Sequence, residues 1–545
     1  MASADRLYFG MYTLRDRLTG DLFDRWSEMG EKRRLLLDRS WAGVFRDHLL
    51  NDLPIDELLL HFDDRLGRPS KDLHIVVGVL LLQHLHDLSD AATVEALAFN
   101  MAWHHALDVR VESDCYFCEK ILRNYRRLFI VKGLDEVLFR RMTDRLVRAF
   151  SVDISHQRMD STALRSAMRS LTRLGIVVET ISKFARELAR FHPALHAQID
   201  SEIIRRYVDR EGAGCFSNTA PSASRRRLDE AGRDLLQLVM QFRTTAAVEL
   251  PGYKVLDLVL REQFEIKNEG ADAPSTVVIP CEPEDMPCDG VSNPADPDAS
   301  YNAHRGLGYM AQIVETYAED DGPADEAAPG SPDLITHVAG RGMTVHDGHR
   351  LPDALDDLAN RSLTPKVLLA DSHYGSAANM TLAGERSIDL TAPARAAKGG
   401  SSGRLTLEDF SLDDVGLVLK CPNGVAPVST SAASAKLQAR FDLAICKGCQ
   451  NRDQCPVQAD KHDGQFARFQ YTPTRAQNQK RRLYENSDTF RAIYRWRAGI
   501  EATMSRLKYQ MNLANLRVRG MPAMRYAVNL RALGLNIRRC AAVQA

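Results

Sequence analysis

The pattern of apolar and polar positions divides the chain into helical stretches and strand-forming stretches. Residues 1 to about 150 have helical patterns, and the long apolar stretch at 72–85 predicts a buried helix. Ser89 then offers an N-cap to a second helix. From residue 164 to about 264, apolar residues recur at i, i+3 and i+4, which again predicts helices. A loop rich in Pro, Asp and Glu follows to about residue 299.

The predicted strands lie between and after these helical stretches. Residues 151–163 form a short strand that ends at Asp160, and residues 308–317 and 334–340 form two more. After a helix at 351–359, the apolar run 365–371 ends in Asp371, which is typical of a buried central strand at the functional edge of an α/β sheet. A further strand is expected at 388–393. The order strand, strand, strand, helix, strand, helix suits a ribonuclease H-like core, so we predict a multidomain protein of the α+β and α/β classes.

A helix near the C-terminus, at residues 494–508, has two distinct faces. At about 100° per residue, four polar side chains fall within roughly 60° of one another. They are Tyr494, Arg497, Glu501 and Lys508. An apolar stripe beside them can pack on a core. A surface helix with an ordinary Arg–Glu ion pair one turn apart has the same pattern, so periodicity alone leaves both interpretations open. A last amphipathic basic helix is expected at 523–540.

Length, composition and charge narrow the class of protein. A chain of 545 residues is too long for one compact domain, and 44% hydrophobic with 26% charged residues is ordinary for soluble proteins. The sequence has no run of about 18 apolar residues and no signal-peptide layout, so we expect a cytoplasmic protein that uses no membrane. The net charge is −1, yet residues 475–545 hold fifteen Lys and Arg against three acids. This basic segment predicts a polyanionic partner.

The cysteines suggest a metal site at one place. In the region 396–474, four cysteines with gaps of 24, 2 and 5 residues could form a tetrahedral thiolate site for structural zinc. They are Cys421, Cys446, Cys449 and Cys455. His462 could compete as a ligand, and four free thiols packed near one another are the alternative. Cys115 and Cys118 have CxxC spacing without a second pair nearby, so we expect ordinary buried thiols there.

The polar face of the 494–508 helix resembles a known signature. Tyr, two residues, Arg, three residues, Glu, six residues and Lys resemble the motif around the catalytic glutamate of DDE transposases of the IS4-like superfamily. Other segments resemble the same family in the expected order: Asp160-Ser161-Thr162, Gly308-Tyr309 with Ala311-Gln312, Val345-His346-Asp347, and Asp371 with Tyr374-Gly375-Ser376. The IS1182-type branch is indicated by a Gly-Arg-Pro segment at 67–69, a Leu-Ser-Asp turn at 88–90 and the Cys-rich insertion.

This resemblance implies an activity and its residues. Asp160, Asp371 and Glu501 would be catalytic and would hold two Mg²⁺ or Mn²⁺ ions for in-line phosphoryl transfer on DNA. Asp153 is the weaker alternative to Asp160, because it lies at the start of its strand. Backbone phosphates would be held by three further side chains, those of Tyr494, Arg497 and Lys508. Trp496 could stack on a flipped base, although a packed aromatic is the expected role.

The implied organisation has four parts. Residues 1–150 would bind the terminal inverted repeats, and 151–163 with 300–395 and 475–545 would form the catalytic core. Residues 164–299 would be a helical insertion with an acidic loop, and 396–474 the Cys-rich insertion. The partner would be double-stranded DNA, bound by a homodimer in a bacterial cytoplasm. An inactive or domesticated DNA-binding protein and a ribonuclease H-like nuclease without strand transfer are the alternatives.

Overall fold

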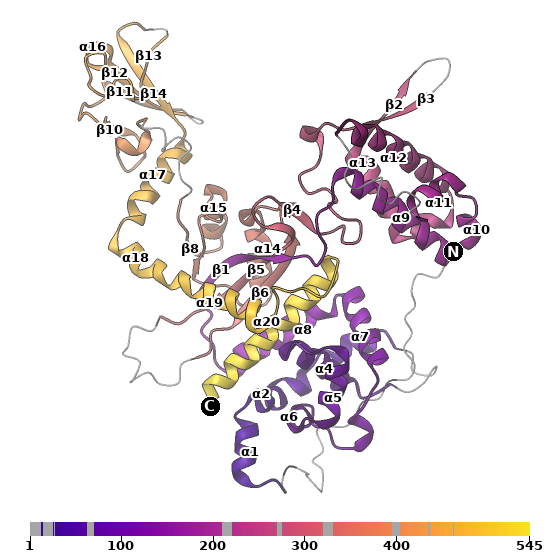
Figure 1. The fold of residues 1–545 in the computed structure, drawn as a ribbon. Coiled ribbons are helices and arrows are strands. Elements are labelled where there is room, and N and C mark those ends of the chain that lie inside the picture. The colour runs from indigo at the N-terminus through magenta and orange to yellow at the C-terminus, as the bar shows by residue number, and fades with distance from the viewer. Residues whose placement is uncertain are drawn as a thin grey trace.

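The protein mixes helices and sheets in several units, with a helical region at the N-terminus, as predicted (Figure 1). The computed structural model describes residues 12, 14, 26, 28–62, 70–209, 221–269, 275–319, 331–394, 404–433, 436–461 and 463–544. Within these ranges no single helix has the length and hydropathy of a membrane span. One helix pair, Leu73–Leu85 with Asp90–Phe99, passes that test jointly but is bent by 116°.

The N-terminal region is helical throughout its described part. The predicted buried helix is α4, whose N-cap Asp72 accepts a hydrogen bond from the Ile75 N–H, and Ser89 caps α5 as predicted. The expected Gly-Arg-Pro segment at 67–69 lies outside the described residues. The elements are α1 (Glu31–Asp38), α2 (Trp41–Val44), η1 (Phe45–Leu49), η2 (Leu50–Asp52), α3 (Ile55–Leu59), α4 (Leu73–Leu85), α5 (Asp90–Phe99), α6 (Met101–Ala106), η3 (Glu112–Asp114), α7 (Glu119–Lys132) and α8 (Leu134–Ala149).

A six-stranded sheet forms the centre of the molecule. Its order is β4-β5-β1-β7-β8, and β6 pairs with β5 next to β4, along residues 309–315 of β5. β5 runs antiparallel to its neighbours β1 and β6. β1, β7 and β8 run parallel to one another. The strands are β1 (His156–Arg165), β4 (Ser300–Asn302), β5 (Gly306–Thr316), β6 (Ile335–Gly342), β7 (Val367–Leu369) and β8 (Asp389–Thr391); η7 (Asp347–Arg350), α14 (Leu351–Asn360) and α15 (Ala377–Glu385) connect them.

The predicted strands and the 351–359 helix are confirmed, with one correction. The strand that was expected to end at Asp160 continues to Arg165, because Ser161 to Arg165 pair in register with β5. Asp160 therefore lies in the middle of β1, opposite Ile313 of β5. Its position is fixed by ladder hydrogen bonds on both sides along the strand rather than by a loop.

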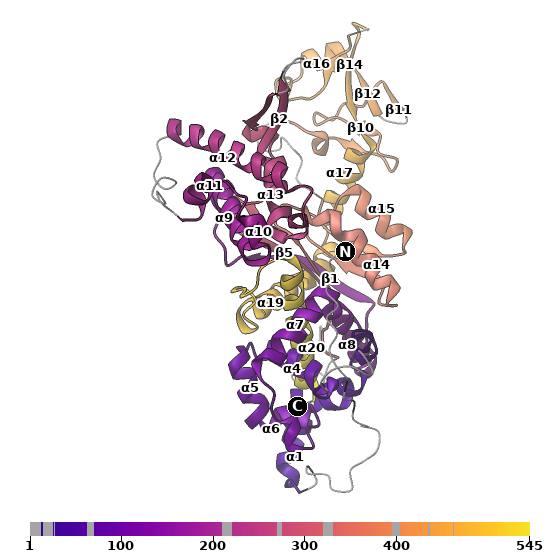
Figure 2. The ribbon, with the colours of Figure 1, turned by 90° about the vertical axis from the view of Figure 1, so that its right-hand side faces the viewer.

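The C-terminal helix α20 (Met521–Gln544) joins the N-terminal helices to the sheet. It packs on α4 and α8 on one side and on β6 on the other (Figures 1 and 2). The helix predicted at 523–540 is confirmed, but the prediction that it is amphipathic was wrong, because every residue from 526 to 537 is buried. Its buried Asn529, Arg531 and Asn536 side chains are hydrogen-bonded, as most buried polar groups are. Asn536 bonds to the backbone N–H and C=O of Ile335 at 2.8 and 2.9 Å, and Arg531 donates to Asp87 at 2.9 Å.

The helical insertion has a hydrophobic core of its own, formed by residues between Leu174 and Val291. Its helices confirm the predicted pattern, whereas the β2–β3 hairpin was not predicted. The elements are α9 (Arg173–Phe191), α10 (Pro193–His196), α11 (Ser201–Tyr207), α12 (Pro221–Phe242), η5 (Ala246–Glu249), α13 (Pro251–Gln263), β2 (Phe264–Glu269), β3 (Ser275–Pro280) and η6 (Pro283–Asp285).

The Cys-rich region is a small β unit with a third hydrophobic cluster. Its four-stranded sheet has the order β11-β12-β14-β13, and α17 leads from it back to the central sheet (Figure 1). The Gly-rich joint expected at 399–403 lies outside the described residues. The elements are η8 (Leu407–Asp409), β9 (Ser411–Leu412), β10 (Val418–Lys420), β11 (Ser429–Ala433), β12 (Lys436–Asp442), α16 (Leu443–Lys447), β13 (Gln458–Ala459), β14 (Phe466–Tyr471) and α17 (Pro473–Glu485).

The contact between α8 and α20 predicts a pH-dependent change in stability. Asp135 is 4% exposed and accepts a hydrogen bond from Asn529 at 2.8 Å, and burial raises its pKa to about 6. Because this folded-state pKa lies above the unfolded value, ionisation of Asp135 destabilises the fold as pH rises through about 6. Asp135→Asn should therefore stabilise the protein by about 1–2 kcal/mol at pH 7.5.

The gain should shrink as the pH falls below the folded-state pKa, because the folded protein then holds Asp135 neutral anyway. Urea unfolding of both proteins across this pH range measures the difference. A stability difference that is independent of pH would contradict the assignment.

Candidate active site

The helix expected at 494–508 is interrupted by two turns that are not α-helical. It is formed by α18 (Asp488–Tyr494), the 3₁₀ turn η9 (Arg495–Ala498), α19 (Gly499–Ser505) and the π-helical turn η10 (Arg506–Gln510). The prediction of one continuous α-helix is therefore wrong in detail, although the chain stays helical throughout. Such turns often mark functional segments of a helix. Here Arg497 lies on the 3₁₀ turn, Glu501 on α19 and Lys508 on the π turn.

Arg158 of β1 holds α19 against the sheet. It precedes Asp160 by two residues, so both side chains lie on the same face of the strand. Its Nη1 donates to the carbonyl oxygen of Trp496 at 2.8 Å, at the turn that leads into α19. A Cβ on Gly499 would lie 2.1 Å from this guanidinium, so only glycine allows so close an approach.

A buried ion-pair network continues behind Arg158. Its Nε donates to Oε1 of Glu315, which is fully buried on β5, at 2.7 Å. The other oxygen of Glu315 accepts from Thr503 Oγ1 at 2.6 Å and from Arg539 Nη1 at 2.9 Å. Strand, α19 and α20 are thus joined through one carboxylate. Sequence reasoning missed this network, although Arg158 and Glu315 lie directly opposite one another in the pairing of two strands that it did predict.

Asp160 lies on β1 beneath this helical segment. Its Oδ2 accepts a hydrogen bond from Arg497 Nη2 at 2.6 Å, and its Oδ1 accepts from the Ser161 N–H at 2.7 Å. Burial raises the pKa of Asp160, and the charges of Asp371 and Glu501 raise it further. The Arg497 charge and the hydrogen bond from the Ser161 N–H oppose this rise. Asp160 therefore lies within electrostatic reach of both other candidate carboxylates, Asp371 and Glu501.

Asp371 follows the end of β7, the parallel neighbour of β1. Its two oxygens accept from the backbone N–H and the ring Nδ1 of His373, both at 2.9 Å. The Tyr494 hydroxyl donates to the adjacent carbonyl of Ala370 at 3.2 Å, which ties α18 to the end of β7. Burial raises the pKa of Tyr494 to about 12, so this phenol stays protonated and can donate.

Glu501 and Lys508 complete the polar face. The Glu501 side chain is 68% exposed, and its Oε1 accepts from Arg497 Nη1 at 3.2 Å. Burial and the nearby charge of Arg305 lower the pKa of Lys508, and the charge of Asp160 opposes them. Despite the two turns that are not α-helical, the side chains of this face lie near Asp160: Arg497 bonds to it, and Tyr494, Glu501 and Lys508 interact with its charge.

Tyr374 supports the carboxylates from below. This buried phenol bonds to Ser161 Oγ at 2.8 Å and accepts from Gln312 Nε2 at 3.1 Å. Arg341 also donates to Ser161 Oγ, at 3.1 Å. The residues that follow Asp160 and Asp371 in the sequence motifs therefore contact one another and fix the spacing of β1, β5 and the β7 turn.

Two alternatives from the sequence have other positions. Asp153 lies before β1, with its side chain 73% exposed, and accepts from the N–H and hydroxyl of Ser155, each at 2.8 Å. It caps a turn at the opposite end of the strand from the candidate site. Trp496 stacks on Tyr317 with ring centroids 6.5 Å apart and is therefore part of the packed structure.

The donor set of the site suits a hard cation, although its present arrangement is not that of a metal site. Within the described ranges, no group of three or more His, Cys, Asp and Glu side chains lies in an arrangement that could hold a metal ion. Three carboxylates of like charge close together disfavour the charged forms without a cation, and carboxylate oxygens are the ligands that Mg²⁺ and Mn²⁺ prefer. In this structure the Arg497 guanidinium supplies the positive charge.

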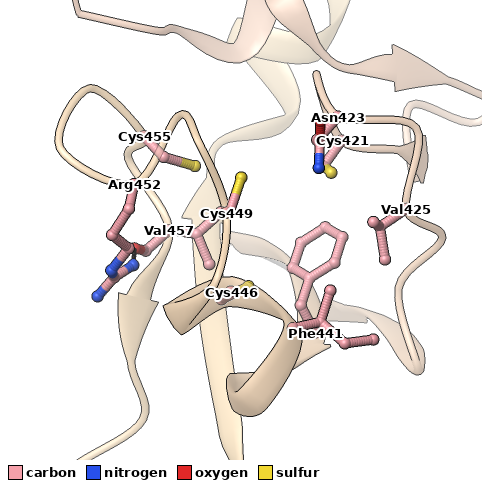
Figure 3. Close-up of a pocket in the computed structure, with 10 residues that line it drawn as sticks. Cys421, Asn423, Val425, Phe441, Cys446, Cys449, Arg452, Cys455 and Val457 are labelled. Atoms are coloured by element: carbon pink, nitrogen blue, oxygen red, sulfur yellow. Dashed lines mark hydrogen bonds between the residues drawn. The ribbon is translucent and has the colours of Figure 1, made fainter.

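The four cysteines of the Cys-rich region line a common cavity of about 30 Å³ (Figure 3). Cys421 follows β10, Cys446 lies on α16 and Cys449 follows it, and Cys455 precedes β13. Burial raises the pKa values of Cys446 and Cys455. The charges of Cys421 and Cys449 raise both pKa values further. His462, the competing ligand considered from the sequence, lies outside the described residues.

Two family models match the chain. Residues 420–541 match a model described as a transposase DDE domain, and residues 44–127 match one described as a transposase domain (DUF772). The first match spans the helical segment with Glu501, and the second spans much of the N-terminal helical region. No curated protein and no solved structure matches the chain. The two matches identify the chain as a DDE transposase of the IS1182-like type.

This membership carries general properties. A DDE transposase is an enzyme of DNA transposition, it acts on DNA, and enzymes of this class generally use divalent metal ions. The resemblance drawn from the Tyr-Arg-Glu-Lys spacing is thereby confirmed at the level of the family.

Proposed function

We propose that the protein binds the terminal inverted repeats of an insertion sequence and performs metal-dependent DNA cleavage and strand transfer, with Asp160, Asp371 and Glu501 as its catalytic carboxylates. One observation carries this proposal. A single guanidinium, that of Arg497, joins Asp160 on the central strand to Glu501 on α19, beside Asp371 at the end of the neighbouring strand. A carboxylate of the central strand and one of α19 thus bond to the same guanidinium, and the third carboxylate lies nearby.

The sheet supports a ribonuclease H-like assignment for the catalytic core. Three antiparallel strands in the order β6-β5-β1 continue into the parallel strands β7 and β8. The core would comprise residues 151–163, 300–395 and 475–545, with 164–299 and 396–474 as insertions. Asp160 lies on β1, Asp371 follows the end of the neighbouring strand β7, and Glu501 lies on the helix that packs over β1.

Asp160, Asp371 and Glu501 would hold Mg²⁺ or Mn²⁺, two ions in all. When bound, these ions lower the pKa of a water or a DNA 3′-hydroxyl and stabilise the leaving oxygen of an in-line displacement. The chain itself positions the DNA: Arg497 can grip a backbone phosphate through two N–H groups, and Lys508 acts as a point charge. Tyr494 would hold a phosphate with its protonated hydroxyl, after exchanging its present bond to the Ala370 carbonyl.

The remaining parts of the proposal concern partners and place of action. Residues 1–150 would bind the terminal repeats, and α20 would transmit their position to the core because it packs on both. We propose a homodimer in the complex with two DNA ends, acting in the cytoplasm of a bacterium. The excess of Lys and Arg over acids in 475–545 suits double-stranded DNA, although Arg531 of this segment is buried and paired with Asp87.

An assay with labelled end DNA and a target plasmid tests the proposal. Metal-dependent cleavage at the end followed by joining to the plasmid is expected. Cleavage without joining would favour a ribonuclease H-like nuclease, and end binding without either reaction would favour an inactive or domesticated DNA-binding protein. Only a transposase produces labelled plasmid.

We further propose structural zinc at the four cysteines. Cys421, Cys446, Cys449 and Cys455 line one cavity and would supply the four thiolates of a closed tetrahedral site, although in this structure they do not lie in a ligating arrangement. The zinc would stabilise this small β unit in addition to its small hydrophobic cluster, since metal binding adds to the folding free energy of such a unit.

Cys449→Ser should remove this zinc. About one zinc per chain is expected in the purified protein by elemental analysis, and less than about a fifth of that in the variant, because a site with three thiolates binds zinc far more weakly. Cys118→Ser is the matched control, since this exposed cysteine belongs to the other CxxC pair. Four freely titratable thiols in the folded, zinc-free wild-type protein would contradict the proposal.

A further inference from the structure

The carboxylates of the candidate site are occupied by protein donors. Both oxygens of Asp160 and both oxygens of Asp371 accept hydrogen bonds, as does Oε1 of Glu501. Arg497 alone provides two of these bonds, one to Asp160 and one to Glu501. Its guanidinium lies between the two side chains, where a metal ion shared by them would have to lie.

A guanidinium and a divalent cation cannot serve the same two carboxylates together. Both are positive, and both require the oxygens that face each other across the site. Metal binding between Asp160 and Glu501 therefore requires Arg497 to leave. The present position of the Arg497 side chain is not fully favourable, because its Nε–H is buried without a hydrogen-bond partner among the described residues. A buried unpaired donor is unfavourable, so this position of Arg497 is only partly satisfied.

A phosphodiester is the group best able to draw the Arg497 guanidinium away from Asp160 and Glu501. Arginine binds phosphate with two parallel N–H bonds, which are stronger than its neutral hydrogen bonds. Arg497 lies on a 3₁₀ turn beside the exposed Glu501, so its side chain can turn toward a DNA backbone lying over the site. The same movement frees the two carboxylates.

We propose that Arg497 is a latch that keeps Asp160 and Glu501 from a divalent cation until a DNA phosphate takes its guanidinium. Metal binding and DNA binding are then coupled, and each strengthens the other by the same factor. This inference rests on the proposed function, because it assumes a metal at these carboxylates and DNA above them. It adds an order of events: the free protein binds the ion weakly, and DNA completes the site.

Titration of the full-length protein with Mn²⁺, followed by the loss of the free-ion electron paramagnetic resonance signal, tests the latch without an activity assay. In the absence of DNA, Arg497→Gln should bind Mn²⁺ at least about fivefold more tightly than wild type, at the lower end of typical coupling between sites. Arg495→Gln is the matched control, since this substitution removes the same charge from the same turn. The Arg495 guanidinium lies over the Trp496 ring. This control variant should bind as wild type does.

Arg497→Lys separates a latch from simple charge repulsion. Lysine keeps the charge but lacks the fork that joins two carboxylates, so the latch predicts tight Mn²⁺ binding and repulsion predicts wild-type binding. Duplex DNA from the end of the element should tighten Mn²⁺ binding to wild type and leave that of Arg497→Gln nearly unchanged.

Two outcomes would overturn the inference in distinguishable ways. Equal Mn²⁺ affinity of wild type and Arg497→Gln, with weaker binding by Asp160→Asn, would refute the latch and keep the metal site. Unchanged Mn²⁺ binding by Asp160→Asn and Glu501→Gln would refute the metal site, and the proposed function with it. Circular dichroism spectra of each variant confirm that the fold is retained.

Discussion

Glu501→Gln should lower DNA cleavage by at least about a thousandfold while leaving end binding within about twofold of wild type. The substitution keeps the size of the side chain and removes the charge that a divalent cation needs. Glu501 is 68% exposed and its partner is Arg497, so the fold does not depend on it. Asp160→Asn and Asp371→Asn should have the same effect, because in-line phosphoryl transfer needs both strands' carboxylates.

Cleavage of labelled end DNA under single-turnover conditions measures the loss, and gel-shift titration measures binding. Asp153→Asn is the matched control, since this carboxylate lies at the other end of β1 and caps a turn. It should retain wild-type cleavage. A Glu501→Gln protein that cleaves at the wild-type rate would disprove the catalytic assignment, whatever the family of the chain.

Arg158→Met should destabilise the central sheet by up to about 3–5 kcal/mol, the usual range for breaking a buried ion pair, because Glu315 would keep Arg539 as a cationic partner. Glu315 would remain fully buried with a weaker set of cationic partners, and the Trp496 carbonyl would lose its donor. Because that carbonyl lies at the start of α19, the substitution should also displace Glu501. We therefore expect lower stability together with lower cleavage in the protein that remains folded.

Thermal unfolding and cleavage assays at a temperature where the variant is folded measure these two effects. Arg205→Met is the control, because Arg205 forms an ion pair with Glu202 in which both side chains are more than half exposed. Such a surface pair contributes about 0–1 kcal/mol. If Arg158→Met proved as stable as this control, the network would not be what holds α19 on β1.

Local patterns predicted most elements of the core correctly. The strands around 308–317 and 334–340 and the 351–359 helix depend on alternation, β-branched residues and a proline in the first turn, all of which are encoded within a few residues. The hairpin β2–β3 and the sheet of the Cys-rich region were missed. Their strands lie in stretches of mixed composition, where pairing with a neighbouring strand outweighs local preference.

The candidate site was predicted by residue type and spacing, and its contacts were not. The gap of four between Arg497 and Glu501 indicates an ion pair on one helix, and this pair forms at 3.2 Å. No spacing indicates that the same guanidinium also reaches Asp160, 337 positions away, at 2.6 Å. The role of Arg158 was likewise hidden, because it depends on the approach of Gly499.

By itself, the sequence determined which side chains could do chemistry and which stretches form regular structure, since both follow from residue type and short-range periodicity. The tertiary structure alone decided that α20 is buried from 526 to 537, that Asp160 lies within its strand, and that Arg497 joins carboxylates of two elements. These features depend on contacts between residues hundreds of positions apart. Their energies come from burial and charge pairing, which arise only when the elements pack together.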